Sequence, residues 1–396
     1  MIRDTQRLKA LLTDVSRFVT EECIPLEEEV DRVGALSEPL VERMRTLGLF
    51  GHSIPEPYGG AGLTSEELSC VNMIVSQAAP VFRARFGGNT GIASEALVVD
   101  GTEEQKQKYL PRLASGEWTG CFALTEPEAG SDATAIQTSA QRDGDTFVLN
   151  GRKCYITNAP LASLFTVFAR TDMTVKGAAG VTAFLIERGT PGLSTPPEMA
   201  KMGQHGSPVG EVHLVNCRVP SSAVLGGELG KGFRSAMRAL NKQRINLAGL
   251  CVGPAMRLVD VMLERAKARK QFGRPIVDFQ LVQQLVAESA TEVQAAKALV
   301  LETSRRRDRG EDITMEASMC KLFASEMCGR VADRAVQLFG GSGYEAGNVA
   351  ERFYRDVRLF RLYEGTSQIH QLNIAKQLLS EPPLRRWQNQ LQHSSD

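Results

Sequence analysis

The residues of this chain that could do chemistry lie in short segments far apart in the sequence. Residues 121–134 read CFALTEPEAGSDAT, a run of small and polar side chains that would let backbone N–H groups approach an anion or a polar ring edge. A turn closed by an Asx-type cap has the same composition. A second segment, YIT at 155–157, is by itself typical of any strand. Neither segment indicates a site when taken alone.

Two further segments have compositions that suit phosphate binding. Residues 264–280 place five basic side chains around Phe272 and Gly273, which could clamp a diphosphate or could simply be a solvated helix end. Residues 337–343, QLFGGSG, could cradle a phosphate or end a helix. No Gly-Lys-Ser/Thr follows this run, and it succeeds a helical stretch rather than a strand. A Walker loop and a Rossmann fingerprint are therefore excluded.

An acid in the segment RLYEGTSQIHQ is the candidate base. Glu364 stands directly before Gly365 and before Thr366, which we expect to cap a helix. A carboxylate there could abstract a proton, although an acid near a helix N-terminus is also favoured by the helix dipole alone.

Composition limits the classes of function. The 396 residues include 46 Lys+Arg and 46 Asp+Glu, so the net charge of zero argues against a protein that binds nucleic-acid phosphates. Eight cysteines without a CxxC pair and five unclustered histidines predict buried free thiols and no metal site. The N-terminus lacks an apolar signal core, and the apolar runs fall short of the roughly 20 residues of a membrane helix. We expect neither secretion nor a membrane partner.

Three regions of different periodicity should position these segments. Region 1–118 is helical, with an apolar face from Leu8 to Val19, a helix that starts at Ser37 and a capping box formed by Thr64 and Glu67. Region 119–230 has strand patterns, including two runs around Asn150-Gly151 that predict a hairpin within an antiparallel β domain.

Region 231–396 returns to the helical period. It predicts helices over 233–270, 278–308, 313–339 and 366–379, long enough to form a bundle, followed by a polar tail. The predicted fold class is α+β, in the order α, β, α.

In combination and in this order, the segments identify one family. The chain resembles an acyl-CoA dehydrogenase over essentially its whole length. LTEPEAGSDATA at 124–135 follows the first signature of the family, and RKQFGRPIVDFQ, ITN and YEGTSQI are further landmarks. The second signature is carried by Gln337, Gly340, Gly341, Gly343, Tyr344, Glu351, Arg352, Arg355 and Asp356.

The resemblance implies an N-terminal helical domain, a middle β domain, a C-terminal four-helix bundle and a non-covalently bound FAD. The flavin or its pyrophosphate would contact Phe122, Leu124, Thr125, Gly130, Ser131, Tyr155, Ile156 and Thr157. The adenosine and pyrophosphate portions would contact Arg269, Phe272, Gln280, Thr366 and Ser367, with Gln337, Gly340 and Gly341 reaching the FAD of a neighbouring subunit. A shared site implies a homodimer or a homotetramer built as a dimer of dimers.

The implied reaction is α,β-dehydrogenation of an acyl-CoA thioester, with electrons passed to an electron-transfer flavoprotein. Glu364 would take the α-proton, and its backbone N–H and an FAD ribityl hydroxyl would hold the thioester oxygen. Ser131, Arg244 and Gly365 would lie on the substrate side. Some branches of the family place the base on the first bundle helix, where this chain has Gln243, an amide that accepts no proton at neutral pH.

Two departures and two alternative functions stay open. His205 stands where many relatives have Arg, and Gly347 where the family usually has an acid.

A flavin oxidase or monooxygenase could use the same scaffold, although Glu364 argues against it. A DNA-associated member would carry a longer basic C-terminal extension than WQNQLQHSSD. The acyl group is not fixed by the sequence, and a carrier-protein thioester is also open. The expected location is the cytoplasm of a bacterium or an organelle matrix.

Overall fold

The computed structural model describes residues 1–380, and its first third is helical, as the periodicity predicts. Thr64 and Glu67 form the predicted capping box, in which each side chain binds the other residue's backbone N–H. Ser37 precedes its helix as expected, but its side chain makes no capping hydrogen bond. The helices of this region are α1 (Thr5–Phe18), α2 (Glu27–Val33), α3 (Glu38–Thr46), α4 (Ser65–Val75), α5 (Pro80–Gly87), α6 (Ile92–Asp100) and α7 (Glu103–Ser115).

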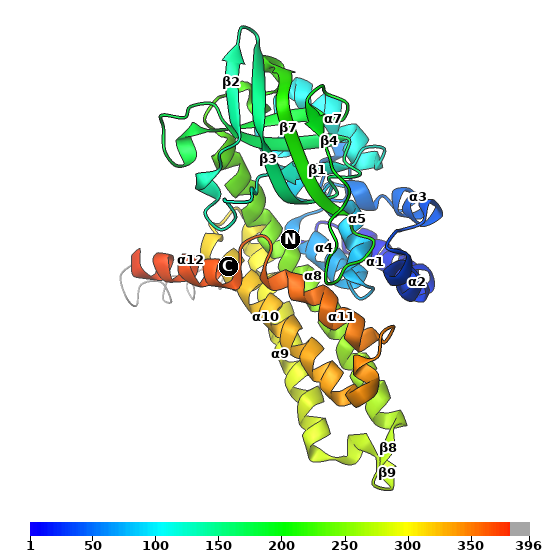
Figure 1. The fold of residues 1–396 in the computed structure, drawn as a ribbon. Helices are drawn as coiled ribbons and strands as arrows, with labels where there is room; N and C mark the ends of the chain where they lie inside the picture. Colours follow the sequence, from blue (N-terminus) through cyan, green and yellow to red (C-terminus); the bar gives the residue numbers. More distant parts are fainter. Residues whose placement is uncertain (381–396) are drawn as a thin grey trace.

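A seven-stranded sheet follows and lies at one end of the molecule (Figure 1). Its order is β1-β4-β2-β3-β7-β6, with β5 paired to β4. The strands are β1 (Gly120–Ala123), β2 (Ser139–Asp143), β3 (Thr146–Thr157), β4 (Leu164–Arg170), β5 (Val181–Glu187), β6 (Leu193–Ser194) and β7 (Val209–Pro220).

Two expectations about this sheet are wrong in detail. The hairpin predicted at Asn150-Gly151 does not form: β3 runs straight through both residues, and the register with β7 shifts there instead. The chain reverses earlier, between β2 and β3 at Gly144, whose φ of 61° suits glycine. The sheet is also not purely antiparallel, because β4 pairs in parallel with β1 and with β2.

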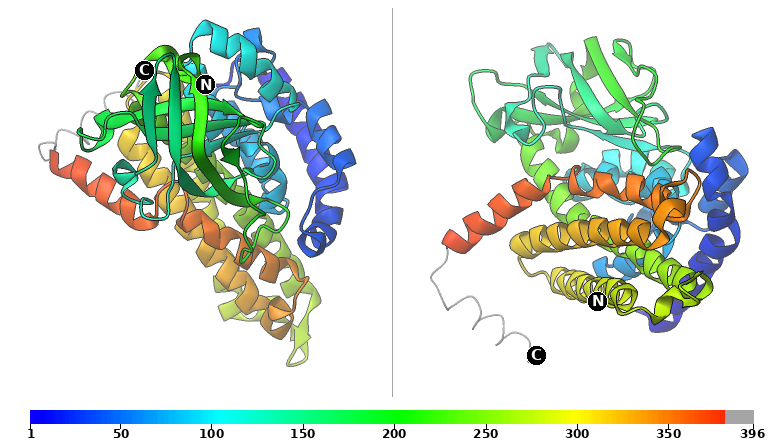
Figure 2. Two further views of the ribbon diagram at one scale, coloured as in Figure 1. Left: turned by 45° about the horizontal axis from the view of Figure 1, so that its top comes forward. Right: turned by 60° about the horizontal axis from the view of Figure 1, so that its bottom comes forward.

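Long helices return after the sheet and form the C-terminal bundle. They are α8 (Gly232–Ala268), α9 (Gln280–Asp308), α10 (Thr314–Phe339), α11 (Val349–Val357) and α12 (Ser367–Ser380). The first ends at Ala268, two residues earlier than predicted, where the small hairpin of β8 (Lys270–Gln271) and β9 (Arg274–Pro275) begins. This hairpin lies at the end of the bundle that is farthest from the sheet, whereas α12 extends outward near the sheet (Figures 1 and 2). The predicted polar tail lies outside the described residues.

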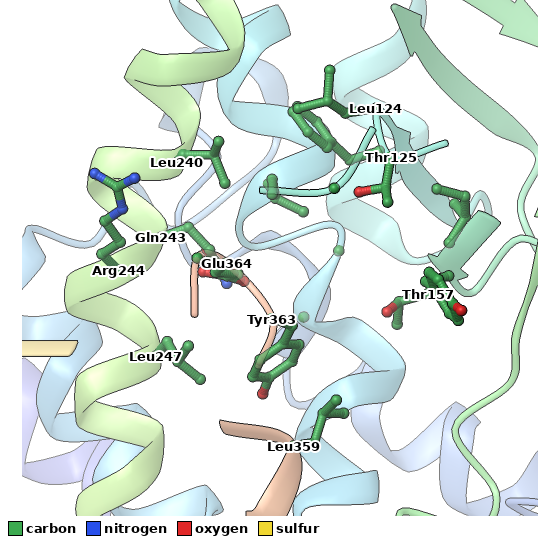
Figure 3. Close-up of a pocket in the computed structure, with 18 of the residues that line it drawn as sticks. Leu124, Thr125, Thr157, Leu240, Gln243, Arg244, Leu247, Leu359, Tyr363 and Glu364 are labelled. Atoms are coloured by element: carbon green, nitrogen blue, oxygen red, sulfur yellow. The ribbon is translucent and has the colours of Figure 1, made fainter. Parts of the chain in front are cut away.

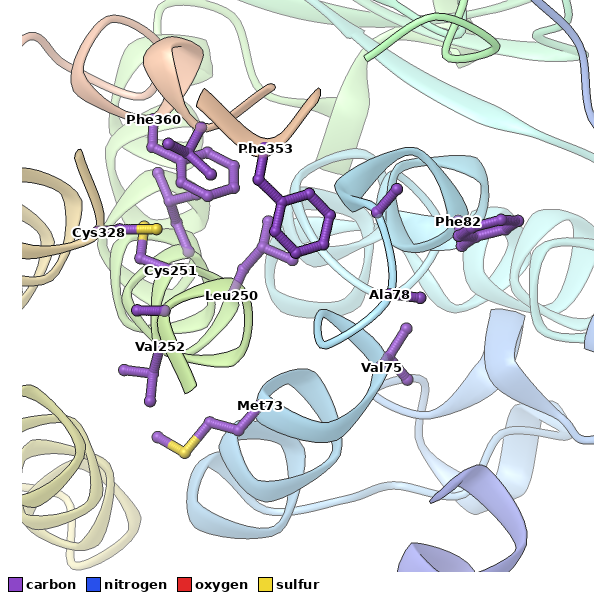
Figure 4. Packing of buried hydrophobic residues seen from close by; sticks show 14 of the residues in the cluster. Met73, Val75, Ala78, Phe82, Leu250, Cys251, Val252, Cys328, Phe353 and Phe360 are labelled. Atoms are coloured by element: carbon purple, nitrogen blue, oxygen red, sulfur yellow. The ribbon is translucent and has the colours of Figure 1, made fainter. Parts of the chain in front are cut away.

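The core joins the first and third regions. Met73, Val75 and Phe82 from α4 and α5 face Leu250 of α8 and Phe353 of α11 across a continuous apolar cluster (Figure 4). By length and composition α8 could cross a membrane, but 72% of its most apolar 18-residue window is buried inside the protein, as in the central helix of a bundle.

One glycine sets the distance between α4 and α8. A Cβ on Gly253 of α8 would lie only 2.0 Å from Ser76 Oγ, at the end of α4. This close approach brings α8 against the end of α4, and side chains of α8 form one wall of the candidate site.

Candidate active site

A cavity of ≈ 410 Å³ lies where the sheet, α5, α8 and the turn before α12 meet. In Figure 3, Glu364 lies between the residues of α8 and the sheet-side residues Leu124, Thr125 and Thr157. Eleven predicted site residues line this cavity: Phe122, Leu124, Thr125, Gly130, Ser131, Tyr155, Ile156, Thr157, Arg244, Glu364 and Gly365. Segments up to 243 residues apart in sequence (121 to 364) are thus brought to one site.

The carboxyl group of Glu364 is held in an unusual electrostatic environment. Its Oε2 is buried and has no hydrogen-bond partner among the described residues. Burial raises the pKa of this carboxyl to about 7, although the charges of Arg83, Lys321 and Arg244 and a hydrogen bond with Gln243 lower it. A carboxylate with a pKa near neutrality is a stronger base than an exposed one and is still ionised in part at pH 7.

The backbone that carries Glu364 is strained and is held by a buried lysine. Glu364 has a φ of 56°, which a non-glycine residue adopts only when its surroundings impose it. Lys321 of α10 is fully buried, and its Nζ donates a hydrogen bond of 2.5 Å to the carbonyl oxygen of Gly365. Burial lowers the pKa of Lys321 to about 8, so it stays mostly charged at neutral pH beside the acid.

A buried histidine closes the other side of this turn. Any Cβ on Gly365 would lie 2.9 Å from Nε2 of His370, so glycine is required for this contact as well as for its φ of 100°. The pKa of His370 is lowered to about 3 by burial and by the charges of Arg244 and Lys321. The ring is therefore neutral and adds no charge to the cavity.

Position 243, the other place where the base could stand, faces the same cavity. Gln243 is buried, accepts a hydrogen bond of 3.3 Å from Asn246 Nδ2 and also bonds to Glu364. Its amide cannot accept a proton, so within the described residues Glu364 is the only carboxylate at either position. Arg244 next to it is buried and donates to Asn241 Oδ1 at 2.8 Å.

A buried ion pair supports the sheet-side wall. Lys153 of β3 is fully buried, and its Nζ donates to Glu126 Oε1 at 2.7 Å and to the carbonyl oxygen of Leu124 at 3.1 Å. Glu126 also accepts from the backbone N–H of Thr138 at 2.9 Å. These bonds fix both ends of the loop that carries Ser131. The role of Glu126 and Lys153 went unpredicted because charge spacing in sequence does not reveal a buried pair 27 residues apart.

The sheet-side wall suits a flat aromatic ring. Tyr155 lines the cavity, is 66% exposed and has a φ of 57°, a backbone conformation that costs free energy for a residue with a side chain. Threonine hydroxyls of Thr125 and Thr157 lie on the same wall and can bond to ring heteroatoms. The residues present therefore fit a flavin.

Eight predicted cofactor residues are outside the lining of this cavity. Six of them are Arg269, Phe272, Gln280, Gln337, Gly340 and Gly341, on or beside the β8–β9 hairpin and the end of α10. Phe272 is 93% exposed and has a φ of 51°, which presents its ring to solvent at the far end of the bundle. Thr366 Oγ1 accepts a hydrogen bond from Ile369 N and so caps α12, as predicted, whereas Ser367 is its first residue and donates to Glu326 Oε1 at 2.5 Å.

The two sequence departures have structural roles outside the cavity lining. Nδ1 of His205 lies 2.9 Å from Asp31 Oδ1, which joins the loop before β7 to α2. Gly347 has a φ of 92°, a conformation that the acid found in relatives would adopt at a cost.

Arg83 and Lys321 were not predicted as site residues, because no local motif distinguishes them from solvated charges.

Family models match three successive parts of the chain. They are described as the N-terminal, middle and C-terminal domains of acyl-CoA dehydrogenase and match residues 5–117, 121–217 and 230–379. The chain belongs to the acyl-CoA dehydrogenase family. The predicted family and fold class are confirmed, and the protein is an oxidoreductase of a family that is typically FAD-dependent. The boundaries 1–118, 119–230 and 231–396 stay predictions.

Relatives of this acyl-CoA dehydrogenase family member span nearly its full length. A 3-(aryl)acrylate reductase of Clostridium sporogenes is 41% identical, covering 91% of this chain and 96% of its own. A subunit of the caffeyl-CoA reductase–Etf complex of Acetobacterium woodii is 39% identical, covering 89% and 93%. The solved butyryl-CoA dehydrogenase of Megasphaera elsdenii superposes with a TM-score of 0.91 at 33% identity and covers 96% of this chain and 100% of its own.

Proposed function

We propose that this protein catalyses FAD-dependent α,β-dehydrogenation of an acyl-CoA thioester and that Glu364 is the catalytic base. The single observation that carries the proposal is a shielded carboxylate with a pKa of about 7, placed between α8 and a sheet wall that fits a flavin. When bound, FAD would supply the electron acceptor for the β-hydride.

Glu364 would act by taking the α-proton of the substrate. The carboxyl already has a raised pKa, and a substrate that displaces the remaining water would raise it further, because desolvation disfavours the anion. The nearby cations Arg83, Lys321 and Arg244 keep the acid ionised in part before the substrate binds. Together they hold the base close to the pH at which it must work.

The strained turn would orient both the carboxyl and the backbone N–H of Glu364. Lys321 and His370 fix Gly365 from two sides, so the turn has little freedom to relax. We propose that the N–H of Glu364 donates to the thioester carbonyl oxygen, which would stabilise the enolate-like charge that develops on proton removal. Ser131, Arg244 and Gly365 would line the path of the thioester.

The cofactor would be held by two sets of residues. The eight sheet-side residues in the cavity, from Phe122 to Thr157, would hold the flavin ring and the start of the pyrophosphate. The six residues near β8 and β9 lie at the far end of the same chain, so we propose that they hold the adenosine portion of the FAD of another subunit. Thr366 and Ser367 would contribute from the start of α12. This arrangement requires a homodimer or a dimer of dimers.

We propose an electron-transfer flavoprotein as the redox partner, because one relative is a subunit of an Etf complex. The names of that relative and of the aryl-acrylate reductase favour a second candidate, reduction of a 2-enoyl thioester. In that direction protonated Glu364 would deliver the proton to Cα. A cytoplasmic or organelle-matrix location stays a prediction.

Anaerobic titration of the FAD-loaded protein with a panel of acyl-CoAs tests the proposal through bleaching of the flavin absorbance. Glu364→Gln should keep its FAD and bind ligand but lose the bleaching rate by about 10³-fold or more, because the amide cannot take a proton. The matched control is Glu345→Gln, which removes an exposed acid and should bleach at the normal rate. Normal bleaching by Glu364→Gln would show that another group is the base.

The direction of the reaction needs a separate measurement. The chemically reduced protein is mixed with 2-enoyl-CoAs, and return of the oxidised flavin spectrum is followed without oxygen. Faster reoxidation by enoyl-CoA than reduction by the matching saturated thioester would favour the reductase direction. Rapid reoxidation by oxygen alone would instead favour an oxidase.

A further inference from the structure

The wall of the cavity formed by α5 carries an arginine that the proposed dehydrogenation does not require. Arg83 is 5% exposed and lines the cavity. Its Nη2 is buried and has no hydrogen-bond partner within residues 1–380, and its Nε makes only a long contact of 3.4 Å with Asn72 Oδ1. No carboxylate of the described part of the chain forms an ion pair with it. Buried guanidinium groups normally have such a partner.

The surrounding backbone is built to accept this guanidinium. Gly87 lies one helical turn after Arg83, and a Cβ there would approach Arg83 Nη1 to 2.2 Å. Even alanine at position 87 would displace the head group. The absence of a side chain at position 87 thus leaves room for the Arg83 head group inside the protein. An arginine that pointed into solvent would not need this room.

The charges around the cavity are unbalanced. Arg83, Arg244 and Lys321 all interact electrostatically with Glu364, which is the acid they share. Arg244 bonds to the neutral Asn241, and Lys321 to a carbonyl oxygen. Lys321 also interacts with Glu326 and does not line the cavity, whereas Arg83 and Arg244 do. One carboxyl that is only partly ionised does not neutralise these two buried arginines. The cavity therefore lacks an anion, and a ligand can supply it.

We propose that Arg83 binds a carboxylate at the end of the acyl chain, so that the substrate is the coenzyme A monothioester of a short dicarboxylic acid. This inference rests on the proposed function. The ω-carboxylate would accept hydrogen bonds from Arg83, including the unpartnered Nη2, while the methylene groups pack against Leu240 and Leu247 of α8. The chemistry is unchanged: the α C–H bond gives its proton to Glu364, the β C–H bond gives a hydride to FAD, and the carboxylate does not react.

A role limited to tuning the base is the alternative. The charge of Arg83 is the largest influence that lowers the pKa of Glu364, so its removal would affect every substrate if this were its whole role. Binding a carboxylate instead predicts a loss confined to substrates that carry one. The two roles differ in how the loss depends on the substrate.

The test measures kcat/KM of the FAD-loaded protein with glutaryl-CoA and adipyl-CoA against pentanoyl-CoA and hexanoyl-CoA. The unaltered protein should prefer the dicarboxylic thioesters. Arg83→Gln should lower kcat/KM for the dicarboxylic thioesters about 100-fold more than for the neutral ones, as expected for loss of a charge-assisted bond to a buried carboxylate. Any loss with the neutral thioesters measures the effect of the Arg83 charge on Glu364. Arg83→Lys should restore part of the loss, because it restores the charge without the planar fork.

Arg85→Gln is the matched control, since Arg85 lies on the same helix, donates to Thr119 Oγ1 at 3.0 Å and is absent from the cavity lining. It should leave the ratio between the two substrate classes unchanged. FAD content and thermal unfolding of each variant establish that it is folded. If Arg83→Gln fails to fold, the preference of the unaltered protein decides by itself.

Two results would overturn the inference. One is an equal loss with both substrate classes, which would assign Arg83 to the base alone. The other is a preference of the unaltered protein for neutral thioesters. If no thioester of either class reduces the flavin, the proposed function itself fails, and this outcome is distinct from both.

Discussion

The chemistry of Glu364 depends on what burial does to one carboxyl group. In water a glutamate has a pKa near 4.3 and is a weak base toward a C–H bond. Here burial outweighs three nearby cations and a hydrogen bond, and the pKa rises to about 7. The sequence identifies the residue through its motif, but the shift exists only because separate segments surround it.

The raised pKa predicts an acid limb in the pH profile of catalysis. In the proposed reaction only the ionised form of Glu364 can take the proton, so kcat/KM should fall as pH decreases through about 7, approaching tenfold per unit below it. His370 is neutral over this range. Lys321 has a pKa of about 8 and therefore stays mostly charged where the acid limb is measured, below pH 7. The measurement is the rate of anaerobic flavin reduction from pH 5.5 to 8.5.

One structural carboxyl titrates near the same range and needs a control. Burial raises the pKa of Asp356 to about 6, and this side chain accepts from the backbone of Gln204, which lines the cavity. Bound FAD and circular dichroism are therefore followed at each pH. An acid limb centred near pH 4.5 with the fold intact would contradict the shift assigned to Glu364.

At the scale of elements, the loop between β1 and β2 owes its shape to a buried pair. Glu126 and Lys153 lie 2.7 Å apart, and burial lowers the pKa of Lys153 to about 8. The carboxylate of Glu126 also accepts hydrogen bonds from the backbone N–H groups of Gln137 and Thr138, at the end of the loop. The loop is thus tied to β3, which carries Tyr155 and Thr157 toward the cavity.

Removing one member of this pair should destabilise the protein strongly. Lys153→Met leaves Glu126 buried without its counter-charge and should cost about 3–5 kcal/mol in the free energy of unfolding, together with weaker FAD retention. Urea unfolding measures the cost. The adjacent Arg152→Met is the control: it removes an exposed pair with Glu211 and should cost less than about 1 kcal/mol. A cost for Lys153→Met no larger than that of the control would contradict the role of the pair.

At the scale of the whole molecule, the two sets of residues proposed to hold the cofactor lie far apart in one chain. The cavity with Glu364 lies beside the sheet, and the exposed Phe272 lies at the opposite end of the bundle. Within residues 1–380 of one copy, the two sets do not meet. A second copy that places its β8–β9 hairpin near the cavity would complete each site.

Mixed oligomers test this sharing. Glu364→Gln and Arg269→Ala should each be inactive alone, the second through loss of FAD. Refolded or co-expressed together, they should recover about a quarter of the normal activity, because random pairing gives half mixed dimers with one intact site each. Glu364→Gln mixed with Thr157→Ala is the control, since both changes lie in the cavity and leave no more than the activity of Thr157→Ala alone. Recovery no greater than in the control would contradict a shared site.

Local patterns in the sequence predicted most elements, and the errors have physical causes. The capping box at Thr64 and the long bundle helices depend on neighbouring residues and were found. The Asn150-Gly151 hairpin was not, because pairing with β7 over the whole of β3 outweighs a local turn preference. The parallel pairs of β4 join strands far apart in sequence, and no local signal encodes them.

The sequence by itself determined the family, the order of helical and β regions and which acid is the candidate base, because these depend on motifs and periodicity carried by contiguous residues. Tertiary structure alone decided that Lys321 holds the turn of Glu364, that the carboxyl has a pKa near neutrality and that Arg83 faces the cavity without a partner. Desolvation and charge are sums over every atom nearby in space, and most of those atoms belong to residues distant in the chain.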